Sequence, residues 1–187
     1  MSLQFNLSAV WLSWQSLPTW VQVGMLKAVT SAGIAPDFLV GASVGAINVA
    51  FFASDPSMQG AIRLEKIWKG IKRQDVFQVS PLAGALSFLS WRNHICSEKP
   101  LKNLIKKHLT YDRLEETQLP CHIVATDLFN GIEVSFSKGP AVNALLASSA
   151  IPGVFAPVEI GAHYLIDGGV TNNTPISVAI ANHRRKK

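Results

Sequence analysis

The sequence predicts an α/β fold with a mostly parallel central sheet, from two observations. Apolar runs of strand length alternate along the chain with segments of helical periodicity: we expect strands at residues 5–10 and 38–42, and helices at residues 21–32 and 44–54. The order strand, helix, strand, helix lays the strands side by side in parallel and covers them with helices. The length of 187 residues and the hydrophobic content of 48% predict a single domain over residues 1–187.

Local signals mark where the first helix ends and the next strand begins. Gly33 follows the helical segment, where a left-handed C-cap is favoured, and Pro36 keeps the chain extended into the strand at residues 38–42. The apolar stretch Phe38–Ala53 is shorter than the roughly 20 residues of a membrane-spanning helix. We therefore expect a buried strand followed by a buried helix.

Residues 61–73 have the pattern of a basic amphipathic helix. Its apolar residues share one helical face: Leu64, Ile67, Trp68 and Ile71. Lysine and arginine occupy most of the remaining surface, so the segment is either a solvated surface helix or a helix that docks peripherally on anionic lipid headgroups. More basic residues would extend that surface if they lie on the same side: Lys102, Lys106, Lys107 and the tail 184–187.

An apolar segment and a hairpin are predicted in the second half of the chain. Residues 81–91 are apolar with little charge, which is typical of a core helix or of a lid that lines a substrate site. Residues 121–125 and 132–136 have the pattern of two strands. Asn130 and Gly131 between them favour a hairpin turn.

Composition narrows the classes of function. A net charge of +5 is compatible with nucleic-acid binding, but no helix-turn-helix, RNP-type or zinc-finger pattern occurs, so we expect no nucleic-acid partner. Cys96 and Cys121 lack the spacing of a zinc site or a disulfide framework, and we expect reduced thiols and neither metal nor cofactor. The first ten residues lack the basic start and the cleavage pattern of a secretory signal, which predicts a cytoplasmic location.

The segment Gly41–Gly45 reads GASVG, the GxSxG pattern of a nucleophile elbow, and stands between a predicted strand and a predicted helix. In this setting a sharp turn exposes the serine hydroxyl, and the flanking Gly41 and Gly45 prevent collisions between strand and helix. The helix N-terminus places partial positive charge nearby, and the backbone N–H of Val44 points toward a developing oxyanion. The alternative is that Ser43 only caps the helix.

A nucleophilic serine needs a proton acceptor. Of the five histidines, only His183 follows Asp167, as the order of an α/β-hydrolase triad requires, and His183 lies in the charged tail. Asp167 ends a short apolar strand, and the glycines that follow it, Gly168 and Gly169, let the backbone turn around the carboxylate. An ordinary Asp-Gly turn is the alternative for this segment.

Five segments resemble motifs of the patatin-like phospholipase family, in the family's order. They are Val23–Ala28 (first helix), Gly41–Asn48 (GASVGAIN, the elbow), Ala125–Leu128 (ATDL), Ala147–Phe155 (ASSAIPGVF) and Asp167–Gly169 (DGG, the catalytic acid loop). The resemblance covers nearly the whole chain downstream of Val21. It implies a small bacterial-type patatin domain with a three-layer α/β/α fold.

The resemblance also implies a serine acyl hydrolase with a Ser–Asp dyad. Asp167 accepts the proton of Ser43 as the hydroxyl attacks an ester carbonyl, and water then hydrolyses the acyl-enzyme. The implied substrates are phospholipids, lysophospholipids, acylglycerols or simple esters, and no metal is implied. Asp127 belongs to a structural strand end in the family pattern, so we assign it no catalytic role.

The chain departs from the family pattern in two places. Family members carry a glycine triplet after the first strand, whose N–H groups form the oxyanion hole, whereas residues 14–18 read WQSLP and no glycine precedes Gly24. Two interpretations follow: an impaired member that binds lipid or a membrane surface without efficient hydrolysis, or a reading-frame slip upstream of Val21. After residues 174–176 family members continue into a further helix and strand, so we also expect a sheet truncated on its C-terminal side.

Overall fold

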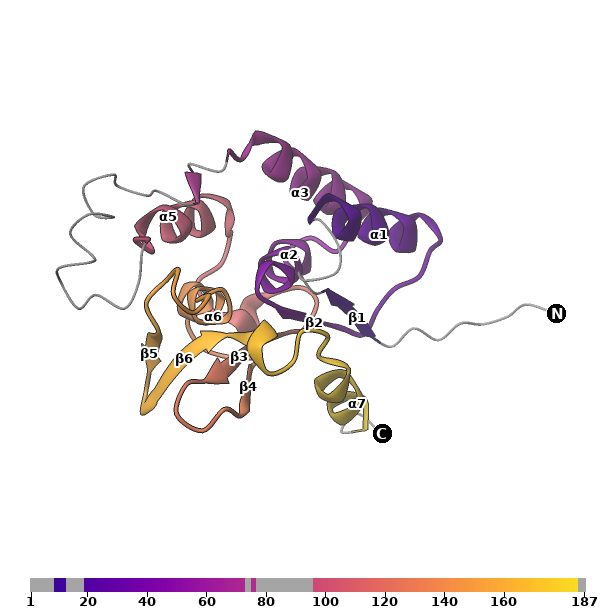
Figure 1. Cartoon of the computed structure of the whole chain (residues 1–187). Coiled ribbons are helices and arrows are strands. Elements are labelled where there is room, and N and C mark those ends of the chain that lie inside the picture. Colours follow the sequence, from indigo (N-terminus) through magenta and orange to yellow (C-terminus); the bar gives the residue numbers. More distant parts are fainter. Residues whose placement is uncertain (1–8, 13–18, 73–74, 77–95, 185–187) are drawn as a thin grey trace.

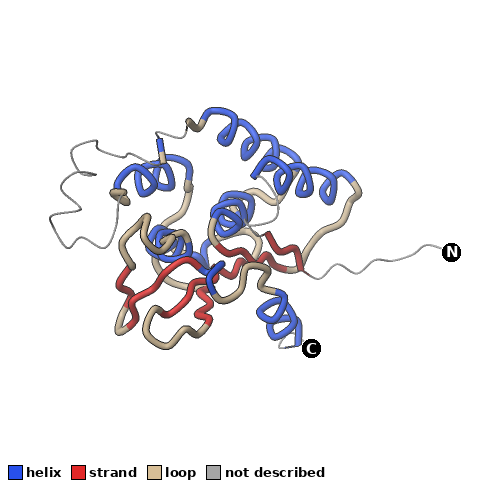
Figure 2. The backbone as a smooth tube through the Cα atoms, in the orientation of Figure 1, coloured by secondary structure: helices blue, strands red, loops and turns tan. Residues whose placement is uncertain are grey.

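In the computed structural model, the described residues are 9–12, 19–72, 75–76 and 96–184. They form one sheet with helices on both faces (Figures 1 and 2). The strands are β1 (Ala9–Leu12), β2 (Phe38–Ala42), β3 (Cys121–Asp127), β4 (Glu133–Phe136), β5 (Val158–Ile160) and β6 (His163–Asp167). The helices are α1 (Thr19–Ser31), α2 (Val44–Ala53), α3 (Met58–Gly70), α5 (Lys99–His108), α6 (Ala141–Ser148), α7 (Ile176–Arg184) and the short 3-10 helices η2 (Leu114–Glu116) and η3 (Gly168–Val170).

The strand order is β1-β2-β3-β6-β5, and β4 pairs with β3 outside this path. β1, β2 and β3 are parallel, β6 is antiparallel to β3, and β5 is antiparallel to β6. β5 therefore runs in the same direction as the first three strands, and the described sheet is mostly parallel, as predicted. β3 and β4 form the predicted hairpin, whose turn contains Gly131 with a φ of 64°.

β2 and β6 meet end to end along one edge of β3. β4 pairs with both Val124 and Ala125 of β3, so it occupies the other edge at both residues. On the remaining edge, Val124 pairs with Ala42 at the end of β2, and Ala125 pairs with Asp167 at the end of β6. The strand ends that carry Ser43 and Asp167 are therefore neighbours in the sheet, although 124 residues separate them in the sequence.

Helices cover the two faces of the sheet unequally, as Figure 1 shows. Five helices pack over the main core on one face: α1, α2, α3, α5 and α6. On the other face, α7 packs Val178 and Ala179 against Phe38 and Val40 of β2. Leu39, between these two strand residues, belongs to the main core instead, as the alternation of side chains along a strand requires. This arrangement confirms the three-layer α/β/α fold.

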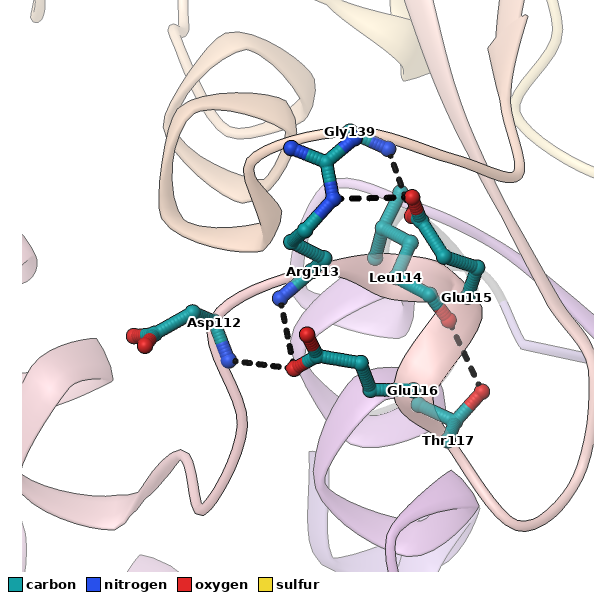
Figure 3. A network of polar contacts seen from close by, with 7 residues as sticks. All are labelled: Asp112, Arg113, Leu114, Glu115, Glu116, Thr117 and Gly139. Carbon is teal, nitrogen blue, oxygen red and sulfur yellow. Dashed lines mark hydrogen bonds and ion pairs between the residues drawn. The ribbon is translucent and has the colours of Figure 1, made fainter.

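A polar network joins the turn before β3 to the loop that leads into α6 (Figure 3). Glu116 accepts hydrogen bonds from the N–H groups of Asp112 and Arg113, at 3.1 and 3.2 Å. Glu115 accepts one from the N–H of Gly139 at 2.7 Å. These bonds fix the chain just before α6, and the opposite end of α6 reaches Ser43.

Several element boundaries differ from the sequence-based expectation. The basic helix α3 spans Met58–Gly70 rather than 61–73, because Ser57 caps its start by accepting a hydrogen bond from Gly60 and because Ile71 is already extended, with φ −80° and ψ 129°. β1 is described at Ala9–Leu12, whereas a strand at 5–10 is expected. The apolar segment 81–91 lies outside the described residues. Among the described helices, none has the length and apolar character required to cross a membrane.

Candidate active site

Ser43 lies at the sharp turn between β2 and α2. Its backbone has φ 55° and ψ −129°, and it is the only non-glycine among the described residues with positive φ. A backbone of this kind costs about 1–3 kcal/mol and persists only where its surroundings hold it. Although Ser43 occupies the N-cap position of α2, its side chain makes no capping bond. The interpretation that Ser43 merely caps the helix is therefore wrong.

Glycines allow the backbone segments at this turn to approach closely. A Cβ on Gly41 would lie 2.5 Å from the carbonyl oxygen of Gly45, and a Cβ on Gly168 would overlap the carbonyl of Val124. A Cβ on Gly169 would lie 2.9 Å from a carboxylate oxygen of Asp167. Side chains at these positions would separate the strand from the helix and the acid loop from the sheet.

Asp167 is the hydrogen-bond acceptor of the Ser43 hydroxyl. The Oγ of Ser43 donates to Oδ2 of Asp167 at 2.6 Å, and the N–H of Gly169 donates to Oδ1 at 2.7 Å. Both Ser43 and Asp167 are 5% exposed. Burial raises the pKa of Asp167 above its ordinary value, while the hydrogen bonds from Ser43 and Gly169 oppose that shift. Asp167 is therefore a stronger base than an exposed aspartate.

The backbone of Asp167 is held on both sides. Its N–H donates to the carbonyl of Ala150 at 2.9 Å, and its own carbonyl accepts the hydroxyl of Thr126 at 2.9 Å. The Thr126 hydroxyl also lies 2.8 Å from the hydroxyl of Thr171. The carboxylate thus projects from a backbone that is bonded to the segment after α6 and to β3, and Thr171 supports the Thr126 side of this arrangement.

Two serines that the sequence reasoning did not single out bind the backbone of Ser43. The N–H of Ser43 donates to Oγ of Ser148 at 2.9 Å, and the carbonyl of Ser43 accepts the hydroxyl of Ser149 at 3.4 Å. Both serines lie in the segment Ala147–Phe155, which reads ASSAIPGVF. This motif singles out the segment in which the two serines lie, but its sequence does not indicate that either serine contacts Ser43.

A small cavity of about 220 Å³ opens beside the Ser–Asp pair. Its lining combines the reactive groups with glycine, proline, aliphatic and amide side chains: Ser43, Ile151, Pro152, Asp167, Gly169, Val170 and Asn173. The hydroxyl and the carboxylate therefore meet beside a partly apolar cavity.

The predicted oxyanion donor, Val44, is the first residue of α2. Its N–H lacks an acceptor within the helix, because the first N–H groups of any helix have none. The N–H of Ser43 is already bonded to Ser148, so it is not a free donor. Residues 14–18, which stand where family members carry their glycine triplet, lie outside the described residues.

The other candidate acids and bases either have a different role or lie on another element. Asp127 accepts hydrogen bonds from the N–H groups of Phe129 and Asn130 and lies 2.6 Å from Nδ1 of His163, so it closes the β3–β4 turn. His183 lies on α7, and its side chain is outside the described part of the structure. The described residues contain no group of three or more His, Cys, Asp or Glu side chains that would hold a metal ion.

Comparisons with known proteins found relatives in sequence and a solved structure of similar fold. An "Uncharacterized NTE family protein" of Mycobacterium bovis is 44% identical over 64 residues, which are 34% of this chain and 18% of that protein. "Probable lipid hydrolase 463L" of Invertebrate iridescent virus 6 is 27% identical over 130 residues, 67% of this chain and 42% of that protein. The crystal structure of VipD from Legionella pneumophila has the same fold, with a TM-score of 0.60 at 14% identity over 89% of this chain and 46% of VipD.

The family assignment rests on the length of the match. The chain spans less than half of each of these relatives. The sequence model of the patatin-like phospholipase family, in contrast, matches residues 17–180, which include the elbow, the segment after α6 and the acid loop. The chain belongs to the patatin-like phospholipase family.

Proposed function

We propose that this chain hydrolyses acyl esters of lipids through a Ser43–Asp167 dyad. The observation that carries the proposal is the 2.6 Å hydrogen bond from the Ser43 hydroxyl to the buried Asp167 carboxylate, at a strained turn beside a cavity. A serine whose hydroxyl is directed at a base of raised pKa has the arrangement of an activated nucleophile. Membership of a lipid-hydrolase family supports the substrate class.

The reaction proceeds in two halves. Oγ of Ser43 attacks the ester carbonyl while its proton moves to Oδ2 of Asp167, and the tetrahedral intermediate then expels the alcohol, which takes the proton from Asp167. In the second half, Asp167 accepts a proton from water as the water attacks the acyl-enzyme. The carboxylic acid leaves, and the proton returns to Oγ of Ser43.

Stabilisation of the oxyanion is assigned to the start of α2. The N–H of Val44 and the positive end of the helix dipole lie next to Ser43 in the chain, where negative charge develops on the carbonyl oxygen. One oxyanion donor is typically worth about 10² to 10³ in turnover. With a single donor from the elbow, we expect slower turnover than in relatives that have the glycine triplet.

The volume of the cavity limits how much of a substrate it can enclose. Its volume of about 220 Å³ is below the roughly 300–1,000 Å³ of pockets that enclose a drug-sized ligand. The ester group and the first carbons of its acyl chain fit, and the rest of a lipid extends over the surface. We therefore expect phospholipids, lysophospholipids and short simple esters all to present their carbonyl to Ser43.

Turnover of p-nitrophenyl butyrate and of a lysophospholipid tests the proposal. The wild type is compared with Ser43→Ala and with the control Ser54→Ala, which removes a hydroxyl at the opposite end of α2. We expect turnover by the wild type and Ser54→Ala, and none above background by Ser43→Ala. Equal turnover by the wild type and Ser43→Ala would refute the assignment.

A second candidate function is lipid-surface binding without efficient hydrolysis, and one observation favours it. α3 and α5 share a groove of about 440 Å³ into which Lys66 and Lys107 both contribute. No described carboxylate lies within ion-pair distance of either lysine. Asp75 also lines this groove, so the two lysines leave it with a net positive charge, which suits peripheral contact with an anionic membrane.

Vesicle binding separates this candidate from the first. We expect the wild type and Ser43→Ala to float with phosphatidylglycerol vesicles more than with phosphatidylcholine vesicles. The double variant Lys66→Glu/Lys107→Glu should lose that preference, while the exposed control Lys138→Glu keeps it. Binding that depends on the two lysines, together with absent turnover, would leave the non-catalytic function ahead.

A histidine-dependent triad is the third candidate, and it predicts a different variant. His183→Ala should abolish turnover if His183 were the base. The dyad predicts turnover close to that of the wild type in His183→Ala and loss of turnover in Asp167→Asn. Measuring both variants with the same butyrate ester decides between the two.

A further inference from the structure

The last residue of α6 and the two residues that follow it contact the backbones of both proposed catalytic residues. Ser148, the last residue of α6, is fully buried, and its Oγ accepts the N–H of Ser43 at 2.9 Å while donating to the carbonyl of Val124 at 2.5 Å. Ser149 donates its hydroxyl to the carbonyl of Ser43 at 3.4 Å. Ala150 accepts the N–H of Asp167 at 2.9 Å. Three consecutive residues thus bind Ser43 and Asp167.

The Ser148 hydroxyl is the most constrained group in these contacts, because it takes part in two hydrogen bonds. A serine hydroxyl has one proton, and here that proton is given to Val124, so the lone pairs of Oγ face the N–H of Ser43. Val124 lies in β3 directly beside the junction of β2 and β6. Ser148 therefore connects the elbow to the strand along which both catalytic strand ends are aligned.

This contact matters because the elbow is strained. Ser43 has a φ of 55° without glycine's freedom, so its conformation needs bonds that hold its peptide groups in place. Without the Ser148 hydroxyl, the buried N–H of Ser43 would lose its acceptor, and the turn would relax toward a conformation that satisfies it. Relaxation would move Oγ of Ser43 away from Asp167, and displacements of about 1 Å are enough to cost about 100-fold in rate.

We propose that Ser148 is a positioning residue for the dyad, acting through the N–H of Ser43, with Ser149 in a lesser supporting role. The proposal rests on the proposed hydrolase function. By occupying the N–H of Ser43, Ser148 also leaves the N–H of Val44 as the donor that the elbow directs to the oxyanion. Ser148 itself does not contact the substrate, because it is fully buried and does not line the cavity.

Steady-state kinetics of Ser148→Ala with p-nitrophenyl butyrate test the proposal. We expect kcat to fall about 10- to 100-fold with little change in KM, because the acyl group still enters the same cavity. Ser149→Ala should lose less, in line with its longer hydrogen bond. Ser54→Ala, which loses a hydroxyl at the other end of α2, should retain the wild-type kcat.

A stability control separates positioning from general loosening. Val178→Ala truncates a buried side chain that packs in the same cluster as Ala42 and Val124, while the hydrogen bonds of Ser148 and Ser149 to Ser43 stay in place. All rates are measured well below the melting temperature of each variant. We expect Val178→Ala to lose at least as much Tm as Ser148→Ala but less kcat. The proposal is overturned if the two variants lose kcat to the same extent. It is also overturned if Ser148→Ala keeps the wild-type kcat.

Amide hydrogen exchange gives a readout that does not need turnover. We expect the N–H of Ser43 to be protected in the wild type and to exchange at least tenfold faster in Ser148→Ala, while amides in the middle of α2 are unchanged. If the wild type shows no turnover and the exchange result is still obtained, the positioning role of Ser148 is supported and the proposed hydrolase function is refuted. Equal protection of the Ser43 amide in both proteins would overturn the inference.

Discussion

Asp127 and Asp167 end neighbouring strands of the same sheet, yet their surroundings differ. Their register positions on the β3–β6 ladder are two residues apart, and they are 2% and 5% exposed. The hydrogen bond with His163, together with those from two turn amides, lowers the pKa of Asp127. Burial raises the pKa of Asp167. Among the described residues, the groups that donate hydrogen bonds to its carboxylate are the N–H of Gly169 and the Ser43 hydroxyl.

The comparison teaches that desolvation by burial and the hydrogen-bond donors around a carboxylate together decide its use. Asp127 is ionised and surrounded by donors that stabilise its charge, so it closes a turn and has little tendency to take a proton. Asp167 has fewer donors and a raised pKa, so it gains by accepting the proton that Ser43 offers. A pair of acids whose pKa values are shifted in opposite directions is the pattern expected beside a catalytic site.

The largest expected effect is on turnover by Asp167→Asn. Asparagine has nearly the same shape but accepts no proton, so kcat/KM for p-nitrophenyl butyrate should fall by about 10² to 10⁴. Asp127→Asn is the matched control, and its kcat/KM should stay within about threefold of the wild type, since a turn residue takes no part in proton transfer. Equal losses in the two variants would break the distinction between the acids.

The pH dependence of kcat/KM should report the raised pKa of Asp167. Only the ionised carboxylate accepts a proton, so the rate should fall about tenfold for each pH unit below that pKa and level off above it. The midpoint should lie above about 3.9, the ordinary value for aspartate, because burial raises the pKa. A midpoint below that value would mean that burial does not control the pKa of this carboxylate.

Asp127→Asn should lower stability, and the loss should depend on pH. A group whose folded pKa is lowered contributes stability above its unfolded pKa, and that contribution disappears as the pH falls through the folded pKa. We therefore expect a Tm a few degrees below that of the wild type at pH 7, with the difference closing in acid. Thermal melts at pH 7 and pH 3 measure it.

Asp167→Asn should shift stability in the opposite direction, by a small amount. A buried carboxylate with a raised pKa costs stability once the pH rises above its unfolded pKa, because its charged form is the disfavoured one. Removing the charge should therefore raise Tm slightly at pH 7 and leave it unchanged in acid. A lower Tm than the wild type at pH 7 would show that the hydrogen bonds of Asp167 outweigh its burial.

Most of the elements near the site are predictable from local sequence. The β2–α2 elbow follows from GASVG between an apolar strand and an apolar helix, and β2 is observed at the predicted residues, Phe38–Ala42. The hairpin of β3 and β4 follows from Asn130 and Gly131. The end of α3 differs from the prediction, because hydrophobic periodicity continues to Ile71 while Gly70 weakens the helix and Asp75 binds the N–H of Lys72.

The arrangement of the site itself depends on long-range contacts that local patterns do not encode. Ser43 and Asp167 are each conspicuous in the sequence, but their meeting requires β2 and β6 to end opposite adjacent residues of β3. Ser148 is a serine at a helix end, an ordinary place for serine, and its bond to the N–H of Ser43 spans 105 residues. Register between distant strands is set by packing of the whole sheet.

Labelling by a fluorophosphonate is the most direct test of the central claim that Asp167 activates Ser43. The account predicts one modified residue in the wild type, located at Ser43 by peptide mass spectrometry. It further predicts wild-type labelling rates in Asp127→Asn, at least 100-fold slower labelling in Asp167→Asn, and none in Ser43→Ala. Folded wild-type protein that stays unlabelled, or Asp167→Asn that is labelled as fast as the wild type, would contradict the account.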